Sequence, residues 1–377
     1  MLKTLLSVTV LIICSQAVQA QQRARDYGIR IGVMKPGKWN AITDVPGVKV
    51  GHTTITQGDS IRTGVTAILP YDGNIFQQKV PAAVFTGNGF GKLAGTTQVQ
   101  ELGNLETPVV LTNTLGVATA MNAVIEYTLK QPGNENVQSV NAVVGETNDG
   151  WLNDIRGQHV TKNDVLTAIQ QANTGAVKEG CVGAGTGTVC FGFKGGIGTS
   201  SRTLPANLGG YTVGVLVQSN FGGVLQIDGV PVGEEWRKFA FSNQLLNNID
   251  GSCMIVVATN APLDARNLQR LAKRAFMGLA KTGGIASNGS GDYVIAFSTA
   301  DSLRIPHNYK QPLQQVSLLH NEETSPLFMA AIEATEEAII NSLFTATNTT
   351  GYKGHAVEAL PIDKVITLFK KYNRLQK

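Results

Sequence analysis

Asn248–Thr259 reads NIDGSCMIVVAT, a polar turn that runs directly into an apolar strand. A serine that follows glycine at the start of a strand can attack the preceding carbonyl carbon, because glycine has no side chain to block the approach and tolerates a strained backbone. Hydrolysis of the resulting ester would make Ser252 a new N-terminus. Its hydroxyl would then lie beside an α-amine with a pKa of about 7.7–8.0, so one residue would supply nucleophile and base. The Gly251–Ser252 bond is therefore a candidate self-cleavage site.

Two alternatives apply to the same stretch. Asp-Gly-Ser is also ordinary turn chemistry, so Ser252 could be a turn residue that leads into a strand. The neighbouring Cys253 is a second candidate nucleophile, because a thiol is intrinsically more reactive than a hydroxyl. The residue found at the new N-terminus after cleavage, Ser252 or Cys253, would show which of the two is the nucleophile.

The first 20 residues have the pattern of a secretory signal. A charged start precedes the apolar run Leu5–Cys14, and small residues follow up to Ala20, after which cleavage is expected. The apolar run is about half the ~20 residues that a spanning helix needs, which argues against a membrane anchor. No later stretch is apolar for long enough to span a bilayer, so the mature chain should have no stable membrane insertion. The pattern predicts export across the inner membrane to the periplasm.

Composition narrows the class of protein. The chain has 377 residues, of which 42% are hydrophobic and 15% charged, which suits one large α/β domain or two fused halves. The net charge of +4 comes without a long basic run, so nucleic acid is not an expected partner. The five histidines are scattered and form no ligand motif, so we expect no metal site.

Removal of the signal leaves an odd number of cysteines. Cys181 and Cys190 could form a bridge in an oxidising compartment, and buried free thiols are the alternative for both and for Cys253. The glycine-rich segments 183–187 and 195–198 match neither a Walker sequence nor a full dinucleotide-binding pattern, so no nucleotide cofactor is expected. They indicate close backbone approach around a packed site.

Strand and helix patterns alternate along the chain. Segments rich in β-branched residues predict strands at Ala82–Thr86, Pro108–Leu111, Val140–Val144, Thr212–Gln218, Met254–Ala258 and Tyr293–Ser298. Apolar residues at three and four spacing, with Thr161 as an N-cap and Pro262 and Pro326 at helix starts, predict helices at Ala118–Leu129, Thr161–Ala172, Leu263–Ala280, Pro326–Phe344 and Pro361–Tyr372.

Several blocks, in order, resemble the peptidase family of L-aminopeptidase/D-esterases and β-peptidyl aminopeptidases. The resemblance covers nearly the whole mature chain and is carried by TDVPGVKVGH (43–52), GNGFG (87–91), GETNDG (145–150), GAGTG (183–187) and VVATNAPL (256–263). It implies an α/β fold in the form of a four-layer αββα sandwich, as in N-terminal-nucleophile hydrolases. It also implies an α-part at residues 21–251 and a β-part at 252–377 that begins with the nucleophile.

The resemblance assigns roles to particular residues. Ser252 would act in self-cleavage at Gly251 and in substrate acylation, and the family holds the freed amine with a serine and an acid two positions apart, here Ser290 and Asp292. Asn220 matches the family's oxyanion donor. Acyl transfer needs such a donor, because it stabilises the charge that develops on the carbonyl oxygen.

The substrate side of the site follows from the block at 145–150. Glu146 matches an acidic residue that captures the substrate's ammonium group. Two residues later the family can carry a tyrosine beside the oxyanion, whereas this chain has Asn148, which could donate through its amide. Trp151 is expected to line the pocket.

The resemblance implies a self-processing serine aminopeptidase that needs no cofactor. It would release N-terminal residues from short peptides, amides or esters, including β-peptides or D-amino acid derivatives, and would form a homo-oligomer, a tetramer of cleaved protomers. One alternative is acyl transfer like that of ornithine acetyltransferases, which use a threonine nucleophile; Ser252 and the secretion signal weigh against it. Another is an uncut secreted ligand-binding protein in which Ser252 is a turn residue.

Overall fold

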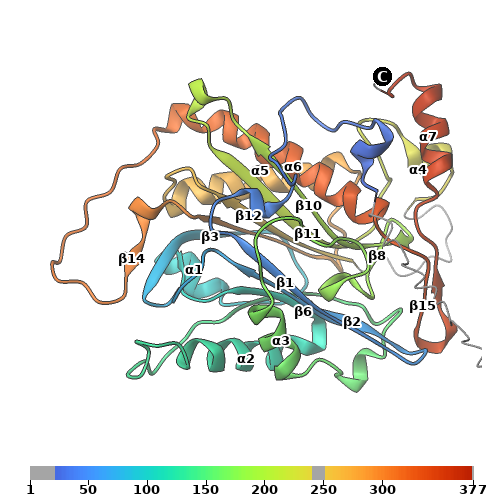
Figure 1. Ribbon diagram of the computed structural model, residues 1–377. Coiled ribbons are helices and arrows are strands. Elements are labelled where there is room, and N and C mark those ends of the chain that lie inside the picture. Colours follow the sequence, from blue (N-terminus) through green and yellow to red (C-terminus); the bar gives the residue numbers. More distant parts are fainter. Residues whose placement is uncertain (1–21, 240–250, 376–377) are drawn as a thin grey trace, which may run out of the picture.

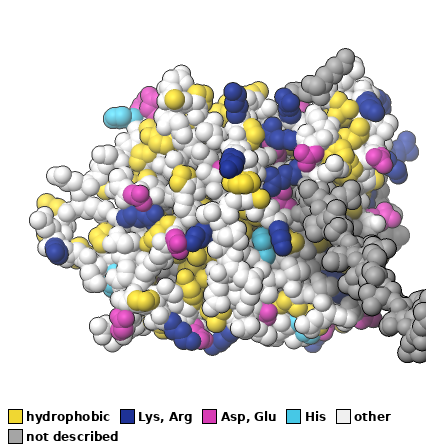
Figure 2. Space-filling model, in the orientation of Figure 1, with side chains coloured by type: hydrophobic (Ala, Val, Ile, Leu, Met, Phe, Trp, Pro, Cys, Tyr) yellow, Lys and Arg dark blue, Asp and Glu magenta, His cyan; other side chains and the backbone are white. Residues whose placement is uncertain are grey.

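The structure is a computed structural model that describes residues 22–239 and 251–375 (Figure 1). The expected signal peptide at residues 1–20 and the turn residues 248–250 lie outside this part of the chain. Across the ranges that are described, no helix is both long and apolar enough to cross a membrane. Basic and acidic side chains are interspersed over the face seen in Figure 2.

Two β-sheets form the centre of the molecule. One has the strand order β1 (Lys49–Gln57), β2 (Ile61–Leu69), β6 (Val109–Asn113), β7 (Val143–Thr147) and β4 (Leu93–Ala94). The other has the order β10 (Gly196–Thr203), β11 (Thr212–Asn220), β12 (Ser252–Thr259), β13 (Gly291–Ser298), β3 (Gln78–Gly89) and β14 (Ile305–Pro306), with β5 (Asn104–Leu105) on β3. Two small pairs are β8 (Val189–Cys190) with β9 (Phe193–Lys194), and β15 (Thr349–Thr350) with β16 (Ala356–Val357).

Helices cover the outer face of each sheet (Figure 1). The first sheet carries α2 (Val117–Leu129) and α3 (Lys162–Gln170), and the second carries α5 (Ala265–Lys281) and α6 (Ser325–Phe344). The remaining helices are α1 (Thr96–Leu102), α4 (Val232–Glu235) and α7 (Ile362–Lys371). The 3₁₀ turns are Ala24–Tyr27, Ile42–Asp44, Thr114–Gly116, Ile155–Gly157, Gly183–Gly185, Ala206–Leu208, Asp301–Leu303, Asn321–Thr324 and Tyr352–Gly354. The expected αββα sandwich is confirmed.

The two faces of β12 serve different layers, because successive side chains of a strand point to opposite sides. Cys253, Ile255 and Val257 pack in the core under α5 and α6. Met254 and Val256, like Leu111 and Val143 of the other sheet, belong to the core between the sheets. By this alternation the side chain of Ser252 faces the space between the sheets.

Each expected strand and helix overlaps an observed one, and some boundaries differ. The helix expected from Leu263 begins at Ala265, because the side chain of Asp264 caps it by accepting from Asn267 N. Pro262 therefore precedes the cap, whereas Pro326 lies in the first turn of α6 as expected. Among the long strands, β1, β2 and β10 were not predicted, because their many glycines and threonines hide the alternation of apolar residues. The two-residue strands were not predicted either.

The cysteines and glycines adopt one of the expected arrangements. All three described cysteines are free, so the Cys181–Cys190 bridge is not formed. A side-chain carbon on Gly185 would lie 2.4 Å from Ile197 N, and one on Gly196 would lie 2.4 Å from Gly180 O. Close backbone approach in these glycine-rich segments is therefore confirmed.

Candidate active site

Ser252 lies at the start of an inner strand, where three strands meet. It pairs with Asn220 at the end of β11 and with Gly291 at the start of β13. The side chain is 5% exposed, and its hydroxyl donates to Gly251 O at 2.6 Å. The N–H of Gly291 donates to Gly251 O at 3.1 Å and to Ser252 Oγ at 3.3 Å. The hydroxyl and one backbone donor thus converge on the same peptide carbonyl.

Only glycine fits at position 251. A side-chain carbon there would lie 2.7 Å from Phe221 Cα and 3.0 Å from Asn220 O. The close approach brings the carbonyl of Gly251 against β11 and under the N–H of Gly291. A donor on a carbonyl oxygen polarises that carbonyl toward nucleophilic attack.

Asn220 has an amide group with a fixed orientation. Its Oδ1 accepts from Val189 N at 2.9 Å, and its Nδ2 donates to Asn148 O at 3.1 Å. A flipped amide would lose both bonds, since a carbonyl cannot donate and an N–H cannot accept. Nδ2 carries a second hydrogen, and Asn220 lies on the same sheet face as Ser252 because the two residues are directly paired. The amide can therefore serve as an oxyanion donor.

Ser290 and Asp292 are buried beside the start of β12. Each is 1% exposed, and Asp292 pairs with Cys253 in the parallel register. Among the described residues, neither Ser290 Oγ nor the carboxyl oxygens of Asp292 have a partner in hydrogen-bonding geometry. Burial raises the pKa of Asp292 to about 6, and the nearby Ser290 hydroxyl and Cys253 N–H offset this only in part. The side chains of Ser290 and Asp292 can therefore accept hydrogen bonds from a cationic group at the N-terminal end of β12.

Glu146 lies near the end of β7 and is 2% exposed. Its carboxylate accepts from Lys92 N at 3.0 Å and from the hydroxyl of Thr114, and Lys92 Nζ lies 3.9 Å from Oε1. A side-chain carbon on Gly91 would lie 3.3 Å from Glu146 Oε1 and 3.0 Å from Gly291 Cα. Glu146 and Gly291, whose N–H donates at the Ser252 site, therefore both lie next to Gly91.

Asn148 and Trp151 have positions that their expected roles did not anticipate. The backbone oxygen of Asn148 orients Asn220, while its Oδ1 accepts from Gly150 N at 2.9 Å. Trp151 is 53% exposed and stacks on His355. No contact in the described structure joins Trp151 to Ser252, so its place in a substrate pocket stays a prediction.

The alternative nucleophile is poorly placed. Cys253 is fully buried and faces the helices α5 and α6. Burial and the nearby Asp292 raise the pKa of its thiol well above the usual value, which disfavours the reactive thiolate. The geometry favours Ser252.

Across the described residues, no group of three or more His, Cys, Asp or Glu side chains could hold a metal ion.

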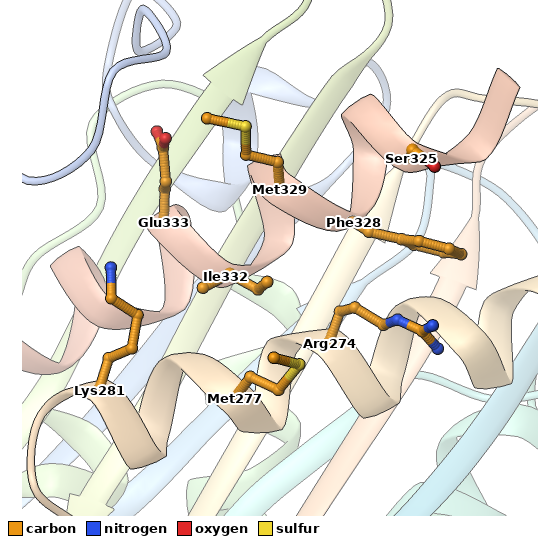
Figure 3. A pocket seen from close by; sticks show the side chains of 8 residues that line it. All are labelled: Arg274, Met277, Lys281, Ser325, Phe328, Met329, Ile332 and Glu333. Carbon is orange, nitrogen blue, oxygen red and sulfur yellow. The ribbon is translucent and has the colours of Figure 1, made fainter.

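A groove between α5 and α6 is unrelated to this site. It has a volume of about 520 Å³ and is lined by side chains of both helices, among them Met277, Phe328 and Met329 (Figure 3). These helices lie on the far side of the second sheet from the space that Ser252 faces. The groove therefore takes no part in the chemistry at Ser252.

The sequence analysis missed four groups that complete the site. Three are backbone groups, namely the N–H of Gly291 and Val189 and the carbonyl of Asn148, for which a residue type carries no signal. The fourth is the hydroxyl of Thr114, which bonds Glu146. Its only sequence signal was its place three residues after the end of the predicted strand Pro108–Leu111, because polar residues in loops often line sites.

The fold and this site define an N-terminal-nucleophile hydrolase of the serine aminopeptidase class. The chain belongs to peptidase family S58, which matches residues 40–357. It is 42% identical over 376 residues to the β-peptidyl aminopeptidase BapA of Sphingosinicella microcystinivorans, a match that covers 94% of this chain and 93% of the relative.

Two solved structures are similar over almost the whole chain. The PH0078 protein from Pyrococcus horikoshii OT3 has 47% identity and a TM-score of 0.87, and the match covers 94% of this chain and 100% of that one. The L-aminopeptidase D-Ala-esterase/amidase of Ochrobactrum anthropi, described as a prototype for the serine aminopeptidases and a variant of the Ntn hydrolase fold, has 37% identity and a TM-score of 0.86, with coverage of 94% and 99%.

Proposed function

We propose that this protein cuts itself between Gly251 and Ser252 and then acts as a serine aminopeptidase on short peptides, amides or esters. The observation that carries the proposal is the contact of the Ser252 hydroxyl with the carbonyl of Gly251 at 2.6 Å, under the N–H of Gly291. Oγ attacks the carbonyl carbon while the oxyanion accepts from the N–H of Gly291. The C–N bond then breaks, and the peptide nitrogen takes up the proton that Oγ has lost and becomes the amine of Ser252. Water then hydrolyses the ester and frees the carboxylate of Gly251.

The freed amine becomes the base for turnover. Ser290 and Asp292, whose side-chain oxygens have no hydrogen-bond partner among the residues that the structure describes, lie beside it. A carboxylate near an amine favours and orients the amine's charged form. In its neutral form the amine removes the proton from Ser252 Oγ, which attacks the substrate carbonyl. Asn220 donates to the oxyanion, the amine returns the proton to the leaving group, and water hydrolyses the acyl-enzyme.

Glu146 supplies the preference for a free substrate amine. Within the described ranges, the donors at hydrogen-bond distance from its buried carboxylate are the neutral Lys92 N–H and Thr114 hydroxyl, while Lys92 Nζ lies 3.9 Å away. A substrate ammonium can therefore form a strong charge-assisted bond there. A capped peptide cannot form this bond.

The processed protein comprises residues 21–251 and 252–377. We place it outside the cytoplasm, in the periplasm, because residues 1–20 have the pattern of a secretory signal. It assembles as a homo-oligomer, with a tetramer of cleaved protomers as the expected state. Cell fractionation checks the location, and light scattering on the purified protein checks the assembly.

N-terminal sequencing and intact mass test the cleavage. Two chains that begin at Gln21 and Ser252 are expected, and a single chain for Ser252→Ala. Cleavage of Ser252→Ala at the same bond would refute self-cleavage by this hydroxyl, and a new N-terminus at Cys253 would select the thiol. A wild-type chain that stays uncut and inactive would instead favour a secreted ligand-binding protein.

A substrate panel tests the activity. It comprises L-α-, β- and D-aminoacyl p-nitroanilides, each with and without an N-acetyl group; names of relatives point to β-peptides and D-Ala derivatives. Hydrolysis of free-amine substrates alone is expected. Equal turnover of the acetylated forms would remove Glu146 from its role. Transfer of the acyl group to an added amine in preference to water would favour the acetyltransferase-like reaction.

A further inference from the structure

A short hairpin near the C-terminus contacts the loop that follows β7. The hairpin is formed by β15 and β16, and in Figure 1 it lies beside the turn between β1 and β2, where Arg62 Nε donates to Thr350 O at 2.9 Å. The loop, residues 148–153, begins with Asn148 and contains Trp151. Tyr352 N donates to Leu152 O at 2.8 Å. Hairpin and loop are thus joined backbone to backbone.

His355 adds a side-chain contact to the same loop. Its Nδ1 lies 2.8 Å from Trp151 O, and its ring stacks on the indole of Trp151 with centroids 3.8 Å apart and planes 11° apart. A carbonyl oxygen only accepts, so Nδ1 carries the proton in this bond. One face of the indole and the backbone of Trp151 are therefore both held by one imidazole.

The loop held in this way also fixes the oxyanion donor. The carbonyl of Asn148, three residues before Trp151, accepts from Asn220 Nδ2 at 3.1 Å. A shift of the loop would move this acceptor and allow the amide of Asn220 to rotate. Displacement by as little as 1 Å of a group that acts in the transition state can cost on the order of a hundredfold in rate.

We propose that His355 is a positioning residue for Asn220, acting through Trp151 and the Asn148 carbonyl. It belongs to the part of the chain that follows the cleavage site, whereas Asn148, Trp151 and Asn220 precede it. The second fragment would thus set the oxyanion donor carried by the first. This inference rests on the proposed aminopeptidase activity.

The test compares His355 variants of the cleaved, full-length protein on a free-amine p-nitroanilide. His355→Ala should lower kcat on the order of tenfold with KM changed less than about twofold, because the oxyanion bond strengthens mainly in the transition state. His355→Asn, whose amide can replace the Nδ1 donor, should recover most of kcat. His320→Ala is the matched control, since His320 is exposed and makes no side-chain cap bond.

A double-mutant cycle with Asn220→Ala separates positioning from general damage. If His355 acts through Asn220, then His355→Ala should cost little further kcat in the Asn220→Ala background. Full additivity, or normal kcat in His355→Ala, overturns the proposal. Normal kcat in Asn220→Ala alone would instead refute the proposed role of Asn220. Urea unfolding of each variant shows whether a lower kcat arises because part of the protein is unfolded.

Discussion

Asn220 can act only if its amide keeps one orientation, and two backbone groups determine that orientation. The N–H of Val189 needs an acceptor, and the carbonyl of Asn148 needs a donor. The same dependence on backbone groups holds at Gly251, whose carbonyl oxygen accepts from Gly291 N. At the residue scale the side chains supply the nucleophile and the charges, and the main chain positions them.

Loss of the Asn220 amide should separate processing from turnover. Asn220→Ala is expected to lose on the order of a hundredfold or more in kcat, the usual cost of one oxyanion donor, with a smaller change in KM. Cleavage at Gly251 should still finish over hours, because it needs one turnover and retains the Gly291 donor. Steady-state kinetics and intact mass on one sample provide both readouts. Asn148→Ala is the control, and a larger loss there would assign the donor to the side chain of Asn148.

Asp292 should make the uncut chain less stable as the pH rises. Its folded pKa of about 6 lies above the unfolded value of 3.8, so the folded state binds the proton more tightly. The stability contributed by the neutral carboxyl is complete below about pH 4 and is lost as the pH rises through about 6, on the order of 2–3 kcal/mol. Urea unfolding of Ser252→Ala at pH 4 and 7 measures this loss.

The comparison variant is Ser252→Ala with Asp292→Asn, which keeps the shape and cannot ionise. Its unfolding free energy should fall less between pH 4 and 7, and it should be the more stable protein at pH 7. The carboxyls of Asp149 and Glu179, whose pKa values burial raises to about 7, contribute equally to both proteins. Identical pH dependence of the two would contradict an unpaired Asp292.

At the scale of elements, β12 is the organising strand. It lies antiparallel to β11 and parallel to β13, so its first residue meets the last of β11 and the first of β13. The sheet in turn rests on α6, which approaches β10 closely enough that a side-chain carbon on Gly198 would lie 1.9 Å from Ala338 O. The position of the site therefore depends on tight packing between helix and strand.

Gly198→Ala should disturb that packing. The added carbon meets a helix backbone oxygen that cannot rotate away, and overpacking of this kind costs about 1–3 kcal/mol. Urea unfolding of the Ser252→Ala protein, with and without Gly198→Ala, measures this loss of unfolding free energy in a chain that is not cleaved. Gly89→Ala is the control, since its added carbon would lie 3.6 Å from Thr86 Cγ2, an ordinary contact. Equal effects of the two substitutions would contradict the close approach of α6 and β10.

At the scale of the whole molecule, the proposed cleavage leaves both fragments in one sheet. β10 and β11 precede the cut, whereas β12 and β13 follow it, and α6 of the second fragment covers β10 and β11. Separation would expose the core under α5 and α6, which contains apolar residues from both sides of the cut. The nicked protein should therefore behave as one folded unit.

The two fragments should stay together until the protein unfolds. Size-exclusion chromatography under native conditions should give a single peak that contains both chains, and denaturing electrophoresis of that peak should give two bands. The fragments should separate only in denaturant, because the apolar area that they share stabilises their association. Ser252→Ala should elute at the same volume and give one band. Elution of either fragment alone in native buffer would refute the shared core.

The sequence alone determined the layer architecture and the candidate side chains. Period-two and helical patterns located most of the long strands, although not β1, β2 and β10, and the main helices. The Gly-Ser step identified Ser252 as a candidate nucleophile. The resemblance to the peptidase family implied the αββα layers and the roles of Asn220 and Glu146. Only the tertiary structure decided that Gly291 and Val189 donate from their backbones and that His355 holds Trp151. The physical reason is that local patterns record which face of an element is buried. Strand register, by contrast, determines which distant residues meet, and every residue type carries the same backbone donor and acceptor.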